Sequence, residues 1–474
     1  MRSAMNFCQN CGARLGEGKF CGNCGHPIPP GQHATSTPVI EDATRPVSPM
    51  PDETLVEAPA AKPPSRHPFG DITLLDYVRD VLALVLLVAS FSMPWDAEGT
   101  AADRIHVVLV TLLAMASLTL PYLKRGGVLP DGWGNAEVRV ARALANVPYF
   151  VVVALTIVID IAADGGGSGG VGVGVGFGLA GAVLAAQARH ADEADDPGHG
   201  RAWRLAAVGI AAVAAALTIV RIVVVLADLG GTDADWGPVT LALLEPVIFI
   251  AVLIVPVAAL LGGRSPARDL LVALGVVAVV MGLWRMSEGS GLPEVLRIRD
   301  DGPAELLWIS IGAAVLAAGV ARLLRPIPAS SHWIDTAAQA LGLTAILTGL
   351  AALYWVVVLT SVDEGRGTSI TVLVLLLLAL VAAIVGRSAV RRDPREGRPV
   401  ALAAAGVLVL IAIIDLAVET AGPHGVTQVS ALVVSSLFVL PALVAVALTV
   451  PRAVRDELGP VELGGAAFGS QPRP

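Results

Sequence analysis

Long runs of apolar residues, separated by short polar connections, recur along most of this 474-residue chain. Many runs are about 18–23 residues long, which is the length that an α-helix needs to cross roughly 30 Å of hydrocarbon. Lipid offers no partner to unpaired backbone groups, so such runs are restricted to helices. The hydrophobic fraction of 55% and the mean hydropathy of +0.72 argue against a set of soluble domains. We therefore expect an all-α polytopic membrane protein.

The apolar runs predict about twelve transmembrane helices within a membrane domain over residues 71–455. Their approximate limits are 78–95, 105–123, 146–163, 171–188, 205–227, 239–261, 270–285, 304–324, 336–359, 370–386, 400–419 and 429–450. Basic residues gather in every second connection, whereas the other connections are acidic or rich in glycine, as in 228–235. By the positive-inside rule, this asymmetry predicts a multi-pass protein of the cell membrane with both termini in the cytoplasm.

The four cysteines of the chain lie near its start, as Cys8, Cys11, Cys21 and Cys24. Two CxxC pairs can place four thiolates tetrahedrally around one Zn²⁺. They precede the first apolar run, so they are expected in the reducing cytosol, where thiols bind metals more often than they form disulfides. We predict a zinc ribbon over residues 5–27 with a structural Zn²⁺. The alternatives are iron in a rubredoxin-like site and a redox-active CxxC pair.

The two cysteine knuckles, Phe7–Gly12 and Phe20–Gly25, are near copies of each other. This double FCxxCG pattern resembles the zinc-ribbon family found at the N-termini of many bacterial membrane proteins. The segment Asp71–Asp80 looks like the start of the membrane domain in uncharacterised ribbon-plus-membrane proteins of actinobacteria. The resemblance implies this architecture and no activity. Few basic residues flank the cysteines, which argues against nucleic-acid binding. Contact with a cytoplasmic protein partner is the expected role of the ribbon.

The ribbon and the membrane domain are joined by residues 28–70, which are rich in proline, serine and threonine. This composition predicts a disordered linker, because it provides too little apolar surface for a core. A flexible chain of this length spans roughly 35–40 Å. Residues 456–474 are expected to form a disordered C-terminal tail. The sequence indicates no oligomeric state.

Ionisable residues fall inside several predicted spans, where they are costly and usually face other helices. Asp160, Arg221, Glu245 and Asp415 are such residues, and Arg285 and Glu419 lie at span borders. All lie within about one to two turns of a predicted outer helix end. One interpretation is an outward-facing polar pocket for a ligand or an ion, in which Arg221 meets carboxylates. The other is that these residues pair for assembly or extend to the interface.

The glycine-rich stretch 171–178 also lies inside a predicted span. Gly176 and Gly178 begin a literal GxGxxG match, but no strand–turn–helix unit surrounds it. The Gly172/Gly176 and Gly174/Gly178 spacings instead predict close helix packing.

Three classes of function fit the sequence. The first is an accessory, regulatory or scaffolding membrane protein whose ribbon recruits partners, and the second is a secondary transporter or lipid flippase. The third is a membrane-embedded glycosyl- or acyl-transferase. Its support is the acidic pairs Asp96/Glu98 and Asp233/Asp235, which could bind a metal ion. No P-loop or HExxH motif is present, and the span centres carry little polarity. These observations favour the first class and argue against an enzyme.

Overall fold

The computed structural model describes residues 72–163, 169–189, 197–228, 236–287, 292–299, 301, 305–361, 365–422 and 426–459. The zinc ribbon predicted over 5–27 and the linker predicted over 28–70 lie outside the described residues. Of the predicted tail over 456–474, the structure describes residues 456–459, and helix α15 extends to Leu458.

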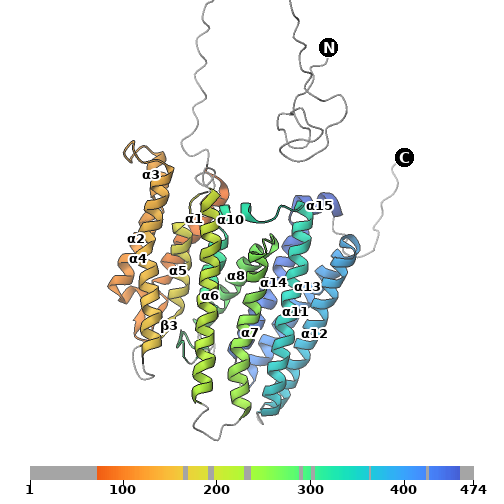
Figure 1. Ribbon diagram of the computed structural model, residues 1–474. Coiled ribbons are helices and arrows are strands. Elements are labelled where there is room, and N and C mark those ends of the chain that lie inside the picture. Colours follow the sequence, from red (N-terminus) through yellow and green to blue (C-terminus); the bar gives the residue numbers. More distant parts are fainter. Residues whose placement is uncertain are drawn as a thin grey trace, which may run out of the picture. The chain divides into compact units, whose positions relative to one another are not determined.

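The described chain is mainly helical (Figure 1). The helices are α1 (Leu74–Ser90), α2 (Ile105–Ser117), α3 (Leu120–Arg125), α4 (Asn135–Ala162), α5 (Val173–Ala186), α6 (Pro197–Asp228), α7 (Trp236–Leu261), α8 (Pro266–Arg285), α9 (Leu306–Val315), α10 (Ala318–Leu323), α11 (Ala329–Ser361), α12 (Arg366–Arg392), α13 (Pro394–Ala421), α14 (Gln428–Thr449) and α15 (Arg452–Leu458). The 3₁₀ turn η1 covers Ala101–Asp103. Two short antiparallel pairs join β1 (Pro94–Asp96) to β2 (Gly99–Thr100) and β3 (Val171–Gly172) to β4 (Val295–Leu296).

Local signals fix the start of several helices. Before α1, the Thr73 hydroxyl accepts a hydrogen bond from the Asp76 N–H, and the Asp76 carboxylate accepts one from the Thr73 N–H, both at 3.3 Å. This is a capping box, which pairs two N–H groups that a helix start would leave open. The side chains of Asp393 and Thr427 cap α13 and α14 by accepting hydrogen bonds from backbone N–H groups of the first turn.

Within the described residues, nine helical segments are long and apolar enough to cross a membrane, with α2 and α3 counted as one. They match nine of the twelve predicted spans. The three others, 78–95, 171–188 and 304–324, correspond to shorter helices: α1, α5 and the broken pair α9–α10. The prediction of an α-helical membrane domain is thus confirmed. At the three other positions the helices are shorter than the predicted spans.

The short helices α5 and α9 lie in the interior. α5 has 14 residues and α9 has 10, and every one of them is buried. At about 1.5 Å per residue, neither reaches the roughly 30 Å of a hydrocarbon core. α5 begins only after the extended residues of β3, and α9 stops at Leu316–Ala317 before α10. Their surrounding helices cover these non-helical backbone segments, as a membrane interior requires.

The helices form three adjoining groups. α1, α2, α4 and α5 pack together, α6 to α9 form the middle group, and α11 to α14 form a four-helix bundle. The groups meet where α5 packs against α9 and where α11 packs against α7 and α8. The glycine stretch serves these contacts: Gly174 approaches the backbone of Ser90 and Pro94, and Gly176 approaches that of Leu306. The predicted close packing is confirmed for Gly174 and Gly176, whereas Gly172 lies in β3 and not in the helix.

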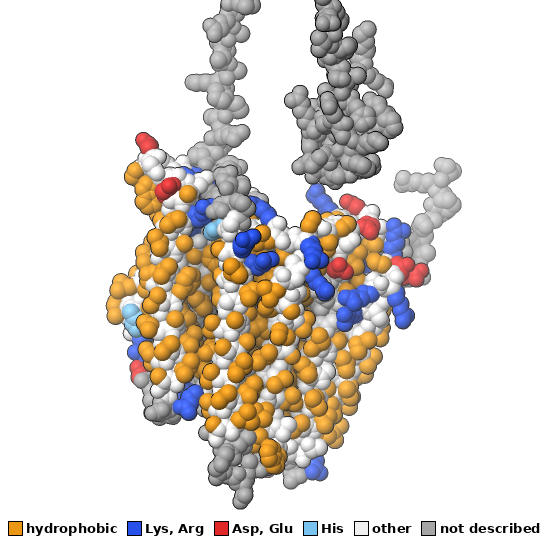
Figure 2. Space-filling view, viewed as in Figure 1, with side chains coloured by type: hydrophobic (Ala, Val, Ile, Leu, Met, Phe, Trp, Pro, Cys, Tyr) orange, Lys and Arg blue, Asp and Glu red, His pale blue; other side chains and the backbone are white. Residues whose placement is uncertain are grey.

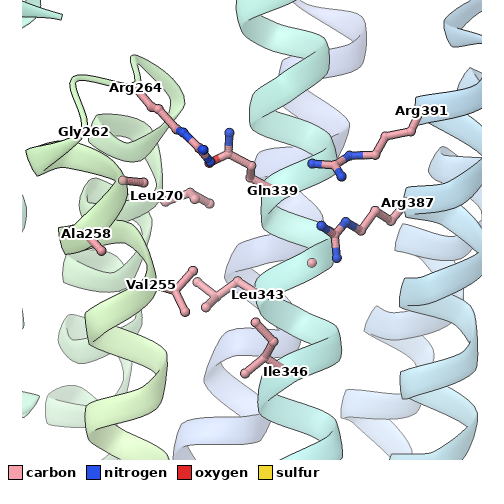
Figure 3. A pocket seen from close by; sticks show the side chains of 12 residues that line it. Val255, Ala258, Gly262, Arg264, Leu270, Gln339, Leu343, Ile346, Arg387 and Arg391 are labelled. Atoms are coloured by element: carbon pink, nitrogen blue, oxygen red, sulfur yellow. The ribbon is translucent and has the colours of Figure 1, made fainter.

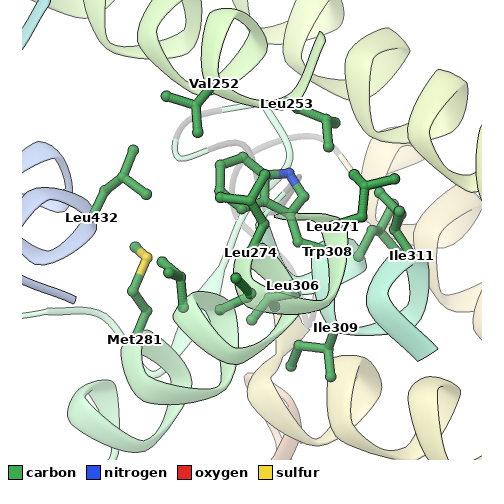
Figure 4. Close-up of a cluster of buried hydrophobic side chains, with 14 of the residues drawn as sticks. Val252, Leu253, Leu271, Leu274, Met281, Leu306, Trp308, Ile309, Ile311 and Leu432 are labelled. Carbon is green, nitrogen blue, oxygen red and sulfur yellow. The ribbon is translucent and has the colours of Figure 1, made fainter. Parts of the chain in front are cut away.

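A buried apolar cluster lies at the centre of the middle group (Figure 4). Trp308 of α9 is only 1% exposed and stacks at a tilt against Phe249 of α7, with ring centroids 5.7 Å apart. Leu271 and Leu274 of α8 and Val252 of α7 surround the same indole in Figure 4. Aromatic burial of this kind contributes to the packing of α7, α8 and α9 against one another.

The two ends of the bundle differ. One end carries α3, α10 and α15 (Figure 1) together with Lys124, Arg322 and Arg452, and we call it the basic end. The other end carries the short strands, and we call it the strand end. Between them, hydrophobic side chains cover the visible lateral surface (Figure 2). Apolar side chains of α4 such as Leu155 and Val158 are more than half exposed. A surface of this kind suits contact with lipid.

Candidate functional site

Three charged side chains bind the connection between α8 and α9 at the strand end. We call this connection, of which residues 292–299, 301 and 305 are described, the 292–305 segment. Asp160 of α4 accepts a hydrogen bond from the Ile298 N–H at 2.8 Å. Arg221 of α6 donates to the Asp301 carbonyl at 3.0 Å.

Arg285, the last residue of α8, is the third of these side chains. It donates to the Pro293 carbonyl at 3.0 Å and forms an ion pair of 2.8 Å with Glu305. It also donates to the Gln428 side chain of α14 at 3.2 Å. Arg285 and Glu305 are each 1% exposed. Buried charges are tolerated when they are paired in this way. Asp160, Arg221 and Arg285 therefore fix the backbone of the 292–305 segment by hydrogen bonds.

Arg221 and Glu245 form a two-pronged ion pair between α6 and α7. The Nη1–Oε1 and Nη2–Oε2 distances are 3.0 and 3.1 Å. The planar guanidinium fork matches a carboxylate in this geometry. Of the four predicted intramembrane residues, the structure therefore joins these two directly. It places Asp160 against the 292–305 segment, and Asp415 apart from both.

Asp415 and Glu419 lie one turn apart on α13 and are 0% and 1% exposed. Within the described residues, neither forms an ion pair, and both oxygens of Asp415 accept no hydrogen bond. The Ser430 hydroxyl of α14 lies beside Glu419. Since an unpaired ionised carboxylate is very costly in an apolar interior, such groups persist by binding a proton or a cation. This pair is the part of the predicted cluster whose chemistry the fold leaves open.

A second buried charge cluster lies toward the basic end around Asp80 of α1. Its carboxylate is 2.5 Å from Nη2 of Arg189 and 3.6 Å from Nη2 of Arg142, and it accepts a hydrogen bond from the Tyr122 hydroxyl at 3.1 Å. The Arg189 guanidinium also lies over the Tyr122 ring, 3.9 Å from its centre. Arg142 and Arg189 are 1% and 0% exposed. One carboxylate thus ties α1, α3, α4 and the end of α5 together.

The alternation of basic connections does not reveal this cluster, because in that pattern Arg142 and Arg189 are simply charges of the basic side. A signal was present in the helix that precedes them. Asp76 and Asp80 are four residues apart at the start of an apolar run, so both carboxylates lie on one helix face. Both are buried, at 3% and 7% exposed. Acidic residues placed there call for cationic partners on neighbouring helices.

The basic end also contains a Ser–His–Asp hydrogen-bonded chain. His332 of α11 lies 3.0 Å from the Ser265 hydroxyl through Nδ1 and 2.8 Å from Asp269 through Nε2. The three residue types are those of a nucleophilic triad, but there Nε2 faces the serine and Nδ1 faces the aspartate, the reverse of this arrangement. Ser265 and Asp269 also lie one turn apart at the start of α8, and the Ala267 and Arg268 N–H groups donate to carbonyls within the same turn. They do not form an oxyanion site, so the chain joins the first turns of α8 and α11.

The acidic pair that suggested a transferase is occupied by an internal cation. Arg104 donates to Asp96 and to Glu98, each at 2.7 Å. These hydrogen bonds raise the pKa of Arg104 above its ordinary value. The second acidic pair, Asp233/Asp235, lies outside the described residues. Asp96 and Glu98 are therefore engaged in a loop ion pair that stabilises the β1–β2 turn.

The four cysteines predicted to bind Zn²⁺, Cys8, Cys11, Cys21 and Cys24, lie outside the described residues. Within the part of the chain that the structure describes, no group of three or more His, Cys, Asp or Glu side chains could hold a metal ion. The zinc site therefore stays a prediction from the cysteine spacing.

Comparison with known proteins yields one family. The model of a family described as "Domain of unknown function (DUF7937)" matches residues 76–457. The match begins in the first turn of α1 and ends within α15, so it coincides with the helical domain. No curated protein and no solved structure matches the chain.

Proposed function

The chain belongs to the DUF7937 family, and from the geometry of its helical domain we propose that it is an accessory or scaffolding membrane protein without catalytic activity. The observation that carries this proposal is the use of the intramembrane charges. Asp160, Arg221 and Arg285 all bind the backbone of the 292–305 segment, so their arrangement supports assembly of the bundle. The engagement of Asp96 and Glu98 by Arg104 supports the absence of a transferase site.

In this proposal the basic end faces the cytoplasm of the cell, with the helices in its plasma membrane. The concentration of Lys and Arg at that end supports this orientation (Figure 2). The ribbon predicted from the cysteine spacing, with its zinc ion, is then a cytoplasmic module that recruits a protein partner to the membrane.

The test is a crosslinked pull-down from native membranes. It compares the wild-type chain with a variant that carries Cys8→Ser, Cys11→Ser, Cys21→Ser and Cys24→Ser. A matched control carries Ser→Ala substitutions at Ser36, Ser48 and Ser65 of the linker region, which leave the cysteines intact. We expect a partner that is retained by the wild type and the control and lost from the cysteine variant. Identical partner profiles in all three would refute the recruitment role.

A secondary transporter is the second candidate, and one observation favours it. Asp415 and Glu419 are buried without a cationic partner in the described chain, and proton-coupled carriers use carboxylates in such positions. The buried short helices α5 and α9 add the discontinuity that is common in transporters. Hydropathy does not reveal that discontinuity, because the glycine run 171–178 and the stretch 306–321 contain no charged residue.

Transport is tested with the full-length protein in proteoliposomes that contain a pH-sensitive dye. A transporter coupled to protons would make the vesicles dissipate an imposed pH gradient, and Asp415→Asn or Glu419→Gln would abolish this flux. Asp456→Asn, at an exposed position of α15, is the control for the same chemical change elsewhere. Flux that is equal in wild-type and substituted vesicles would exclude this carboxylate pair as the coupling site.

A further inference from the structure

A cavity of about 360 Å³ lies near the basic end between α7, α11 and α12 (Figure 3). α11 packs against both α7 and α12, so it forms the floor of the cavity and the other two helices form its walls. The lining side chains include Arg264, Arg387, Arg391, Gln339, Val255 and Ile346. The cavity is separate from the strand-end charges and from the Asp80 cluster.

Three arginines of this cavity have no anionic partner. Within the described residues, Arg264, Arg387 and Arg391 form no ion pair, in contrast to Arg189 and Arg221, which each bind a carboxylate. Arg387 and Arg391 lie four residues apart on α12, where like charges face each other and repel. Three converging guanidinium groups are therefore an uncompensated positive site, and the planar guanidinium is the preferred partner of phosphate.

Gly342 of α11 allows one of these groups to lie deep in the cavity. A Cβ atom at Gly342 would be 3.1 Å from Cζ of Arg387 and 3.2 Å from its Nη1. The guanidinium thus rests close to the backbone of the cavity floor, where a Cβ would require it to shift by a few tenths of an ångström. Figure 3 shows Arg387 nearer than Arg391 to the level of Val255 and Leu343.

The cavity changes from polar to apolar along the bundle. Figure 3 shows the side chains of Arg264, Gln339 and Arg391 at one level and those of Val255, Leu343 and Ile346 at another. Val255 and Ile346 are 39% and 38% exposed, so the apolar part opens onto the lateral surface. A phospholipid has the same order, with a charged phosphate at the interface and acyl chains toward the bilayer centre.

We propose that this cavity binds an anionic glycerophospholipid, with its phosphate between Arg264, Arg387 and Arg391 and its acyl chains against Val255 and Ile346. A soluble phosphate would match the guanidinium groups but would leave the open apolar wall without a partner. The apolar wall is the reason for choosing a lipid as the occupant. Basic pockets between helices near one membrane face are sites of this kind in other membrane proteins.

The proposal is tested by native mass spectrometry on the delipidated full-length protein in detergent. Phosphatidylglycerol and phosphatidylcholine of the same acyl chains are titrated against the wild type and against a variant carrying Arg264→Gln, Arg387→Gln and Arg391→Gln. We expect the wild type to bind phosphatidylglycerol at least tenfold more tightly than phosphatidylcholine. We expect the triple variant to lose at least tenfold in affinity for phosphatidylglycerol.

Arg392→Gln is the matched control. Arg392 is the neighbour of Arg391 on α12, is exposed and does not line the cavity, so its substitution should leave the affinity unchanged. Arg387→Lys keeps the charge but not the planar fork, and an intermediate loss is expected. Because the three arginines have no partner in the described chain, the triple variant should keep the elution volume of the wild type.

Two results would overturn the proposal. One is equal affinity for the two lipids, or an affinity for phosphatidylglycerol that the triple variant retains. The other is displacement of phosphatidylglycerol by millimolar inorganic phosphate at constant ionic strength, which would assign the cavity to a free phosphate.

Discussion

Arg221 of α6 and Glu245 of α7 face each other across the helix pair as guanidinium and carboxylate, joined by two hydrogen bonds of 3.0 and 3.1 Å. Arg221 is 8% exposed, and its Nη1 also donates to the Asp301 carbonyl. The pair therefore links the contact between two helices to the position of the 292–305 segment.

This link predicts an asymmetric result for single and double substitutions. Arg221→Met alone leaves the Glu245 carboxylate, which is 13% exposed, without its partner, and we expect a cost toward the lower end of the about 3–5 kcal/mol for breaking a buried pair. The double variant Arg221→Met, Glu245→Leu removes both charges and is expected to cost clearly less than Arg221→Met alone. Thermal unfolding of the detergent-solubilised protein measures the free-energy differences. If the loss of stability in the double variant equalled the sum of the losses measured for Arg221→Met and for Glu245→Leu separately, the two side chains would not be coupled.

Substitution of Asp80 is expected to be among the most damaging changes in the domain. Asp80→Asn leaves the buried guanidinium groups of Arg142 and Arg189 without their shared carboxylate, at an expected cost of about 3–5 kcal/mol. Tyr122→Phe removes one hydrogen bond to the same carboxylate but keeps the ring beneath Arg189, and should cost about 1 kcal/mol. Comparable melting temperatures for the two variants would show that Asp80 does not carry the cluster.

Substitution of Gly178 by alanine is expected to cause a steric clash, and the same substitution at Gly209 is its control. A Cβ at Gly178 would lie 1.7 Å from the hydroxyl of the buried Tyr149, so Gly178→Ala should destabilise the protein by about 1–3 kcal/mol or more. Gly209 of α6 has nothing within 4 Å of the same position. Gly209→Ala should therefore stabilise its helix by about 0.5–1 kcal/mol. Melting temperatures of the two variants test the contrast, and a Gly178→Ala variant as stable as the wild type would contradict the role of this glycine in the close approach of α4 and α5.

Asp415 and Glu419 should respond to neutralisation in the opposite way from Asp160. Asp415→Asn and Glu419→Gln replace buried carboxyl groups that have no cationic partner in the described chain, so stability at neutral pH should be unchanged or higher. Asp160→Asn removes a charged acceptor of the Ile298 N–H and should cost about 1.5–3 kcal/mol. Parallel melting curves in detergent test the contrast. A marked loss in Asp415→Asn would reveal a cationic partner of that carboxylate.

The outcome for these residues shows what a sequence can and cannot reveal about a helical membrane domain. Hydropathy located the long helices, because a stretch that spans lipid must be apolar along its whole length. It overestimated the lengths of α5 and α9, because a helix that other helices bury can be equally apolar without spanning the membrane. Helix length then depends on tertiary contacts that no local pattern records.

Contacts of the charged side chains could be predicted from the sequence only between helices that follow each other in the chain. Arg221 and Glu245 lie 24 residues apart on the consecutive helices α6 and α7, so their shared depth made a contact foreseeable. Asp160 and Ile298 lie 138 residues apart, and their contact depends on β3 meeting β4. Asp415 has the same predicted depth as the others, but depth does not determine the direction in which a side chain points around its helix.

The zinc prediction can be tested independently of the helical domain. The spacing of Cys8, Cys11, Cys21 and Cys24 predicts one Zn²⁺ per chain. Elemental analysis of the purified full-length protein should find one equivalent, and Cys8→Ser with Cys24→Ser should abolish it. A strong chelator should remove the ion from the wild type and leave the melting temperature of the helical domain unchanged, because its family match begins only at residue 76. Iron in place of zinc would identify a rubredoxin-like site, and a metal-free chain with oxidised cysteines would identify a redox pair.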